Sequence, residues 1–238
     1  MIACVRKVLD FVFPVKCVGC GKPDVLVCDG CVSGVRLLDS QVCPHCRRAS
    51  PRGSFCGGQC RDGLFGYPSS FDHLVVCSRY DKTGVLKKII ERFKYKYSEE
   101  LTDVLGHFYV EQVEILNKFF EQDFDGAVMV PVPLHSKRFR ERGFNQAYLL
   151  AKEIEFDWEL RSVLIRVKNT PHQARLDRAG RLRNLNNAFS IKHNSRIEGR
   201  NIVLIDDVCT TGATLNECAK VLKKAGAGKV LGFVLARG

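Results

Sequence analysis

The sequence predicts an α/β domain with a mostly parallel sheet flanked by helices, preceded by a small cysteine-rich segment that folds around metal. Two observations predict this order. From residue 71 onward, short apolar runs typical of buried strands alternate with segments whose apolar residues recur every three or four positions, as in helices. Residues 15–63 are instead rich in Cys, Gly and Pro and sustain no such period. Alternating strands and helices imply right-handed crossovers and therefore a mostly parallel sheet.

The N-terminal residues 1–14 predict a short amphipathic helix that ends at Pro14, because apolar residues stand at positions 2, 5, 8, 9 and 12. Arg6, Lys7 and Asp10 interrupt the apolar character, which argues against a signal peptide. No apolar run approaches the roughly 20 residues that a membrane-spanning helix needs. We therefore expect a cytoplasmic protein with no membrane span.

The α/β region is expected to begin at residue 71, after a change of composition near residues 63–70. The strands expected from the apolar runs are residues 74–77, 127–132, 162–167, 201–205 and 229–235. The helices expected from the apolar spacing are residues 85–93, 101–120, 144–156, 177–187 and 214–225. The predicted organisation is thus a helix over residues 1–14, a metal segment over 15–63 and an α/β domain over 71–238, which has enough apolar residues to fold around its own core.

Eight of the 12 cysteines form four closely spaced pairs: Cys17 with Cys20, Cys28 with Cys31, Cys43 with Cys46, and Cys56 with Cys60. Two thiolates separated by a tight turn bind one tetrahedral ion, so eight predict about two zinc ions. Four thiolates leave no open coordination position, so the zinc would be structural. Ligation could be sequential or cross-braced. Disulfides are the alternative, but they are disfavoured in a cytosolic protein. His45 lies between ligand cysteines and could replace one of them, but its sequence position favours an ordinary turn residue.

Two adjacent carboxylates, Asp206 and Asp207, follow the clearest predicted strand and precede a small polar loop that opens a helix. Amides at a helix N-terminus and threonine hydroxyls bind phosphate, and a glycine lets the backbone approach it. Adjacent acids at the carboxyl end of a strand suit the vicinal hydroxyls of a ribose. The alternative is a capped helix that follows a chance acid pair. The residues expected to hold phosphate are Thr210, Thr211, Gly212, Ala213 and Thr214.

This acid pair and loop are similar to the phosphoribosyl-pyrophosphate signature of type I phosphoribosyltransferases. Together with the cysteine pairs and the segment 130–147, they resemble the ComF family of competence proteins; the resemblance also covers Phe71, Asp72, Tyr80, Lys94 and residues 169–173. It implies a phosphoribosyltransferase-like fold after a double zinc ribbon, a hood at about residues 71–97, and magnesium bound with phosphoribosyl pyrophosphate. It further implies a mobile loop, for which His172 and Arg175 are the candidate residues.

Basic residues gather in two places. Lys137, Arg138, Arg140 and Arg142 follow a predicted strand, where this fold holds pyrophosphate; the alternative is a solvated charge run. A second basic run covers residues 161–183. The formal net charge is +11, which falls to roughly +7 if two zinc ions bind eight thiolates. The excess suits an anionic partner, either a polyphosphate or single-stranded DNA. A rival DNA surface near the last cysteine pairs contains Arg47, Arg48, Arg52 and Arg61.

Three functions follow as hypotheses. The chain could transfer ribosyl phosphate from phosphoribosyl pyrophosphate, it could bind incoming single-stranded DNA together with the uptake machinery, or it could sense nucleotides without chemistry. Fold alone does not decide among them. The competence resemblance favours a role in natural transformation with a retained ribose-phosphate site. The sequence leaves open the acceptor substrate, the oligomeric state and whether the host takes up DNA.

Overall fold

The computed structural model describes residues 15–238 except 82, 121–122, 155, 157 and 170–184. Its centre is a five-stranded sheet in the order β1-β7-β6-β2-β3, in which every neighbouring pair is parallel. The strands are β1 (His73–Arg79), β2 (Val128–Pro131), β3 (Glu159–Leu160), β6 (Ile202–Cys209) and β7 (Val230–Arg237). All eight residues of β7 are buried, as expected of a central strand in a sheet covered on both faces.

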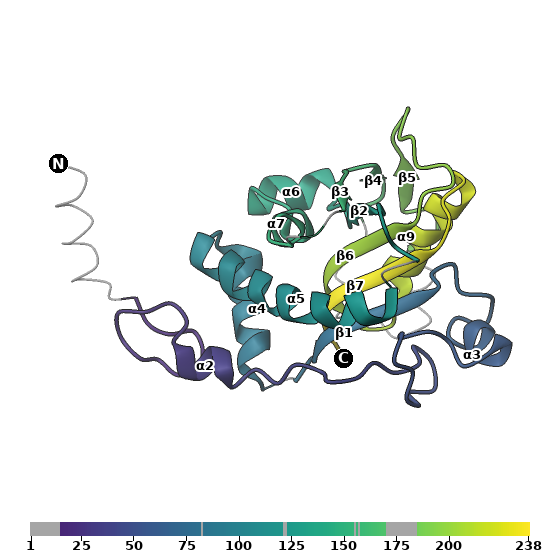
Figure 1. The fold of residues 1–238 in the computed structure, drawn as a ribbon. Coiled ribbons are helices and arrows are strands. Elements are labelled where there is room, and N and C mark those ends of the chain that lie inside the picture. The colour runs from purple at the N-terminus through teal and green to yellow at the C-terminus, as the bar shows by residue number, and fades with distance from the viewer. Residues whose placement is uncertain (1–14, 82, 121–122, 155, 157, 170–184) are drawn as a thin grey trace.

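Helices cover the two faces of this sheet (Figure 1). One core cluster joins one sheet face to α4 (Val85–Tyr95), α5 (Glu99–Phe120) and α7 (Gln146–Lys152), with Phe93 and Tyr109 fully buried in it. The second cluster joins the opposite face to α9 (Ala213–Lys224). A further short helix, α6 (Ser136–Arg142), connects β2 to α7. Within the described part of the chain, every helix is too short or too polar to cross a bilayer.

The predicted α/β pattern is confirmed, and two of the expected strands differ from their prediction. The strand expected at residues 162–167 is β4 (Leu164–Arg166), which lies outside the main sheet and pairs antiparallel with β5 (Phe189–Ile191). The strand expected to end at residue 205 continues through both acids to Cys209, because β7 pairs with it as far as Arg237. The helix expected at residues 177–187 falls largely outside the described residues, as does the helix at 1–14.

The cysteine-rich segment lies along the outer edge of β1. Two short helices, α2 (Asp29–Ser33) and α3 (Gly58–Gly63), lie at opposite ends of this segment, and the chain between them passes beside β1 (Figure 1). Antiparallel bridges pair Leu37 with Ser78 and Ser54 with His73. An open edge strand is a site for unwanted pairing, and this segment covers it.

Buried polar contacts fix the same segment in register. Gln41 is 1% exposed; its side chain accepts from the Val76 amide at 2.9 Å and donates to the Val76 carbonyl at 3.1 Å. Gly53 has a positive φ of 59°, and a Cβ on it would lie 2.1 Å from the Leu74 carbonyl oxygen, so only glycine fits there. The metal segment and the sheet therefore share an interface that the sequence did not predict.

Candidate functional site

The acid pair lies near the carboxyl end of β6. Asp207 is 8% exposed and Asp206 is partly buried, and the Asp206 carboxylate accepts from the Asp207 amide at 2.9 Å. The Tyr109 hydroxyl, which comes from α5, donates to the Asp206 carbonyl at 2.5 Å. Helix α5 thus holds the backbone of β6 through this hydrogen bond, and the two carboxylates lie near the carboxyl end of the strand.

Lys94, at the end of α4, neutralises part of this negative charge. Its ammonium lies 3.0 Å from the Asp207 carboxylate. Burial tends to lower the pKa of Lys94, but attraction to Asp207 and Asp206 outweighs burial, and the pKa is raised. Burial and the neighbouring Asp207 charge raise the pKa of Asp206 to about 7, although Lys94 opposes this. Asp206 is therefore harder to ionise than an ordinary aspartate.

The predicted phosphate loop lies between β6 and α9. Gly212 is the N-cap residue with a φ of 82°, a left-handed conformation that glycine adopts without strain. The Ala213 amide donates to the Thr211 hydroxyl at 3.3 Å, and Thr210 is exposed. The loop and the first turn of α9 form the amide-rich helix start that binds anions in other proteins.

A segment between the cysteine cluster and β1 supports this loop from below. A Cβ on Gly212 would lie 3.4 Å from Phe65 and 3.6 Å from Phe71, so two aromatic rings pack directly beneath the glycine. The Asn216 side chain, one turn into α9, accepts from the Ser70 amide at 2.8 Å. Asn216 is completely buried, and sequence reasoning missed it because its partner is 146 residues away.

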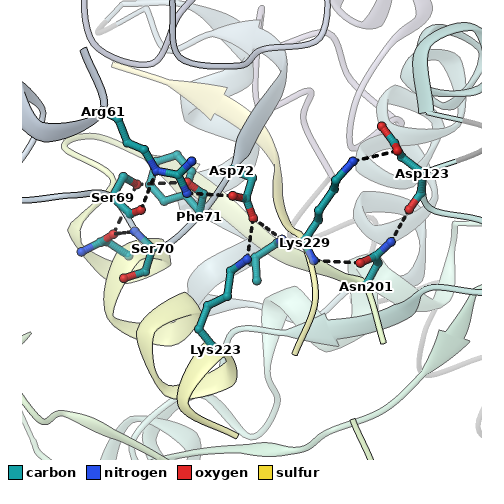
Figure 2. A network of polar contacts seen from close by, with 11 residues as sticks. Arg61, Ser69, Ser70, Phe71, Asp72, Asp123, Asn201, Lys223 and Lys229 are labelled. Carbon is teal, nitrogen blue, oxygen red and sulfur yellow. Dashed lines mark hydrogen bonds and ion pairs between the residues drawn. The ribbon is translucent and has the colours of Figure 1, made fainter. Parts of the chain in front are cut away.

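An ionic network around Asp72 continues this support (Figure 2). Arg61, which follows the last cysteine, donates to Asp72 at 2.7 Å and to the Ser69 carbonyl at 3.1 Å. The other Asp72 oxygen lies 2.9 Å from the Lys223 ammonium and accepts from the Val230 amide at 2.8 Å. Burial alone would raise the pKa of Asp72, but Lys223, the amide and Arg61 together lower it. Asp72 thus links the cysteine segment, α9 and β7.

The four basic residues predicted for pyrophosphate lie on α6, a helix that the sequence interpretation took as a loop. Arg138 and Arg142 are partly buried, whereas Lys137 and Arg140 are exposed. Burial and the nearby Arg142 charge lower the pKa of Arg138. Arg142 also lies within electrostatic range of Lys94. Arg142 therefore lies near the lysine that contacts the acid pair, Arg138 lies near Arg142, and the other two are on the surface.

Arg166 was not among the predicted site residues, yet it belongs to the same charged group. It is 8% exposed on β4, and its guanidinium lies 5.4 Å from the centre of the Phe189 ring. Burial and the charge of Arg138 lower the pKa of Arg166, while Asp206 opposes them, so all three charges interact. The sequence did contain one indication of this role, since Arg166 lies between the apolar residues of a predicted strand. His172 and Arg175 lie outside the described residues.

A cavity of about 1060 Å³ opens at the carboxyl ends of β1 and β7. Arg79, Tyr80 and Arg237 line it from the sheet, and residues 34–42 of the cysteine segment line the other side. Tyr80 interacts electrostatically with Lys94 and Asp207, which places this wall of the cavity near the predicted ribose site.

The cysteine pairs group sequentially into two four-sulfur clusters rather than in the cross-braced order. In each cluster, all sulfur atoms lie within 4.8 Å of one another; the first cluster contains Cys17, Cys20, Cys28 and Cys31, and the second Cys43, Cys46, Cys56 and Cys60. Close sulfur pairs are 3.5–3.7 Å apart. These separations are too long for a disulfide and match a tetrahedron with Zn–S bonds of about 2.3 Å.

Local contacts favour metal in both clusters. A Cβ on Gly19 would lie 2.4 Å from Cys31 Sγ, so this turn requires glycine. The Arg48 guanidinium, which donates to Cys46 Sγ at 3.5 Å, is the main cause that lowers the pKa of this thiol to about 6, whereas the close contact with Cys46 raises the pKa of the Cys56 thiol when no metal is bound. Thiolate is the form that binds zinc. Both clusters fit a structural zinc ion.

The chain matches two family models in the expected order. Residues 8–61 match the double zinc ribbon domain, and residues 140–237 match the phosphoribosyl transferase domain. The second match and the parallel sheet together give a phosphoribosyltransferase-like fold. Adenine phosphoribosyltransferase from Saccharomyces cerevisiae shows a weak structural likeness, with 16% identity and a TM-score of 0.35 over 63% of this chain and 73% of its own.

Similar proteins with curated names cover most of the sequence. Competence protein ComFC of Bacillus subtilis (strain 168) is 34% identical, over 91% of this chain and 86% of its own. Competence protein F of Haemophilus influenzae is 31% identical, over 89% and 90%, and the DNA utilization protein YhgH of Escherichia coli (strain K12) is 29% identical, over 89% and 90%. By this similarity and by its two family domains, the chain belongs to the ComF family of competence proteins.

Proposed function

We propose that the chain binds phosphoribosyl pyrophosphate together with Mg²⁺ and acts on the cytoplasmic side in DNA uptake. The observation that carries this proposal is the placement of Asp206 and Asp207 beside the glycine-capped start of α9. Carboxylates accept hydrogen bonds from ribose hydroxyls, while helix amides and threonine hydroxyls hold a phosphate. The names of the relatives, which refer to competence and DNA utilization, support the biological role.

In this arrangement, the charged residues around the acids would hold the pyrophosphate. Arg138, Arg142 and Arg166 interact electrostatically with one another, and Arg166 interacts with Asp206. They would neutralise pyrophosphate oxygens, and Mg²⁺ would add positive charge to the same group of oxygens. Departure of pyrophosphate leaves an oxocarbenium-like centre at the ribose, which the protein would stabilise through positioning and charge. The cavity beside Tyr80 would give the acceptor room to reach that centre.

Calorimetry with phosphoribosyl pyrophosphate and Mg²⁺ tests the binding proposal. Replacing both acids (Asp206→Asn with Asp207→Asn) should weaken binding by at least about 100-fold, since two charge-assisted contacts of about 1.5 kcal/mol or more are lost. Thr211→Ala should cost less, because the loop amides still contact the phosphate. Equal affinities of the wild type and the double variant would refute the proposal.

A second candidate is a binding protein that performs no transfer. The Lys94–Asp207 ion pair favours it, because an ammonium that holds one oxygen of the acid would hinder the positioning of the ribose that transfer requires. Measurement of pyrophosphate release with and without candidate acceptors separates the two functions. Release that depends on an acceptor identifies a transferase, and tight binding without release identifies a sensor.

A further inference from the structure

An exposed group of aromatic and basic side chains lies where the end of α4 meets α6. Tyr95 is 73% exposed and Tyr97 is 51% exposed, whereas Phe93 on the same helix is fully buried. Phe139 on α6 is 48% exposed. Single exposed rings are common on protein surfaces, but three on two adjoining elements are a feature that requires an explanation.

Measured contacts join the two elements. The Arg142 guanidinium lies 5.8 Å from the centre of the Tyr95 ring. The Tyr97 ring lies 5.5 Å from that of Phe144, two residues after the end of α6. Arg138 interacts electrostatically with both Tyr95 and Arg142. Segments more than 40 residues apart in the sequence therefore form one surface, here named the aromatic–basic platform: Tyr95, Tyr97, Arg138 and Arg142, flanked along α6 by the exposed Phe139 and Arg140.

The platform is strongly basic. Helix α6 has four basic residues and one acid, Glu141, within seven positions. At the end of α4, Lys96 is exposed between the two tyrosines, and Glu91 is paired with Lys87 at 3.6 Å. Lys94, which neighbours Tyr95, forms the ion pair with Asp207. Tyr95, the first residue of the platform, thus directly follows in sequence the lysine that contacts the predicted ribose site.

We propose that the aromatic–basic platform binds single-stranded nucleic acid. Exposed rings stack on unpaired bases of any sequence, and the cations beside them contact the phosphates. A duplex does not present base faces to such rings, so this combination favours a single strand over a duplex. The proposal extends the proposed role in DNA uptake by naming the surface that holds the strand.

The basic run at residues 161–183 is a weaker candidate for this surface, because the basic side chains of its described part are paired, buried or hydrogen-bonded. Arg161 is paired with Glu159 at 2.6 Å and donates to the Ser195 carbonyl at 3.2 Å. Arg166 is buried, and Lys168 donates to the Asn186 carbonyl at 2.7 Å. The rival arginines near the last cysteines are similarly engaged, since Arg61 contacts Asp72 and Arg52 contacts Asp123. The platform instead places basic side chains, of which Lys96 and Arg140 beside it are exposed, next to exposed rings.

Fluorescence anisotropy of the full chain tests the proposal, with labelled oligo(dT) and oligo(U) of about 20 nucleotides and a DNA duplex of the same length. The variant Tyr95→Leu with Tyr97→Leu keeps apolar surface but removes both π-faces. It should weaken single-strand binding by roughly 5- to 100-fold per ring. The matched control, Tyr95→Phe with Tyr97→Phe, should bind like the wild type, and the relative affinity for oligo(dT) and oligo(U) identifies the natural strand.

Salt titration separates the charges from the rings. Arg140→Ala should make the log–log salt dependence shallower by about 0.7 if it contacts one phosphate, whereas the leucine variant should keep the slope of the wild type. Phe139→Leu is an independent test of stacking on α6. Equal affinity for single strand and duplex, or unchanged binding by the leucine variants, would overturn the platform. Binding of phosphoribosyl pyrophosphate should be retained in the leucine variants, which distinguishes a failure of the platform from a failure of the ribose site.

Discussion

The two zinc clusters have the same four-cysteine ligand set but different surroundings. The first cluster lies against the starts of α4 and α5, where Lys88 donates to the Gly19 carbonyl at 3.0 Å and Glu100 accepts from the Leu26 amide at 3.1 Å. The second lies at the other end of the segment, next to chain that pairs with β1 and supports the phosphate loop (Figure 1). We therefore expect two clusters with the same ligands to contribute differently to the fold, according to what the neighbouring chain contacts.

The largest expected effect is on stability. Cys17 and Cys43 are both buried, so their serine variants form a matched pair. Each should lose one of about two bound zinc ions. Cys43→Ser should cost about 4 kcal/mol, because it also exposes the β1 edge, and Cys17→Ser about 2 kcal/mol. Denaturant unfolding with metal analysis of each variant measures both quantities, and equal costs would remove the distinction between the clusters.

A smaller effect is expected at the link between the second cluster and the sheet. Arg61→Ala should cost about 1–2 kcal/mol, because Asp72 loses a charged hydrogen bond; the 39% exposure of the Arg61 side chain limits the loss. Arg61→Lys keeps the charge but not both contacts and should fall between the alanine variant and the wild type. Arg52→Ala breaks a more exposed pair and should cost under about 0.5 kcal/mol. Chemical denaturation measures the free energy of unfolding of each variant. A larger loss in Arg52→Ala than in Arg61→Ala would contradict the account.

Short-range patterns were predictable from the sequence, and long-range partners were not. The cysteine pairs, the acid pair and the glycine loop are each specified within a few residues, so spacing was enough to find them. The pairing of Leu37 with Ser78 and the bond from Ser70 to Asn216 join distant segments, and no local period records such contacts. For the same reason, the α/β region was expected to be independent of the metal segment, although Gln41 is buried against β1.

The smallest predicted effect concerns pH and separates the acid pair from the loop support. Because the pKa of Asp206 is about 7, raised mainly by burial, a ribose that requires its ionised form should bind more tightly as pH rises from 6 to 8. The gain should stay below about tenfold per pH unit, since one proton is released. Arg61→Ala should lower affinity by a similar factor across this range.

Calorimetry at several pH values checks this prediction. Asp206→Asn serves as the control that reports the ionisation of the ligand alone. A profile in Asp206→Asn as steep as that of the wild type, or steeper, would show that Asp206 does not titrate in the way assumed.

The most direct test of the central claim, that the second cluster supports the phosphate loop, is hydrogen–deuterium exchange at residues 210–216. Cys20 and Cys56 are both exposed ligands, one from each cluster, so Cys20→Ser and Cys56→Ser form a second matched pair. We expect Cys56→Ser to accelerate exchange of these amides by at least about tenfold, a loss of about 1.4 kcal/mol of local stability, and Cys20→Ser to leave them unchanged. Equal exchange at these amides in the two variants would contradict the account.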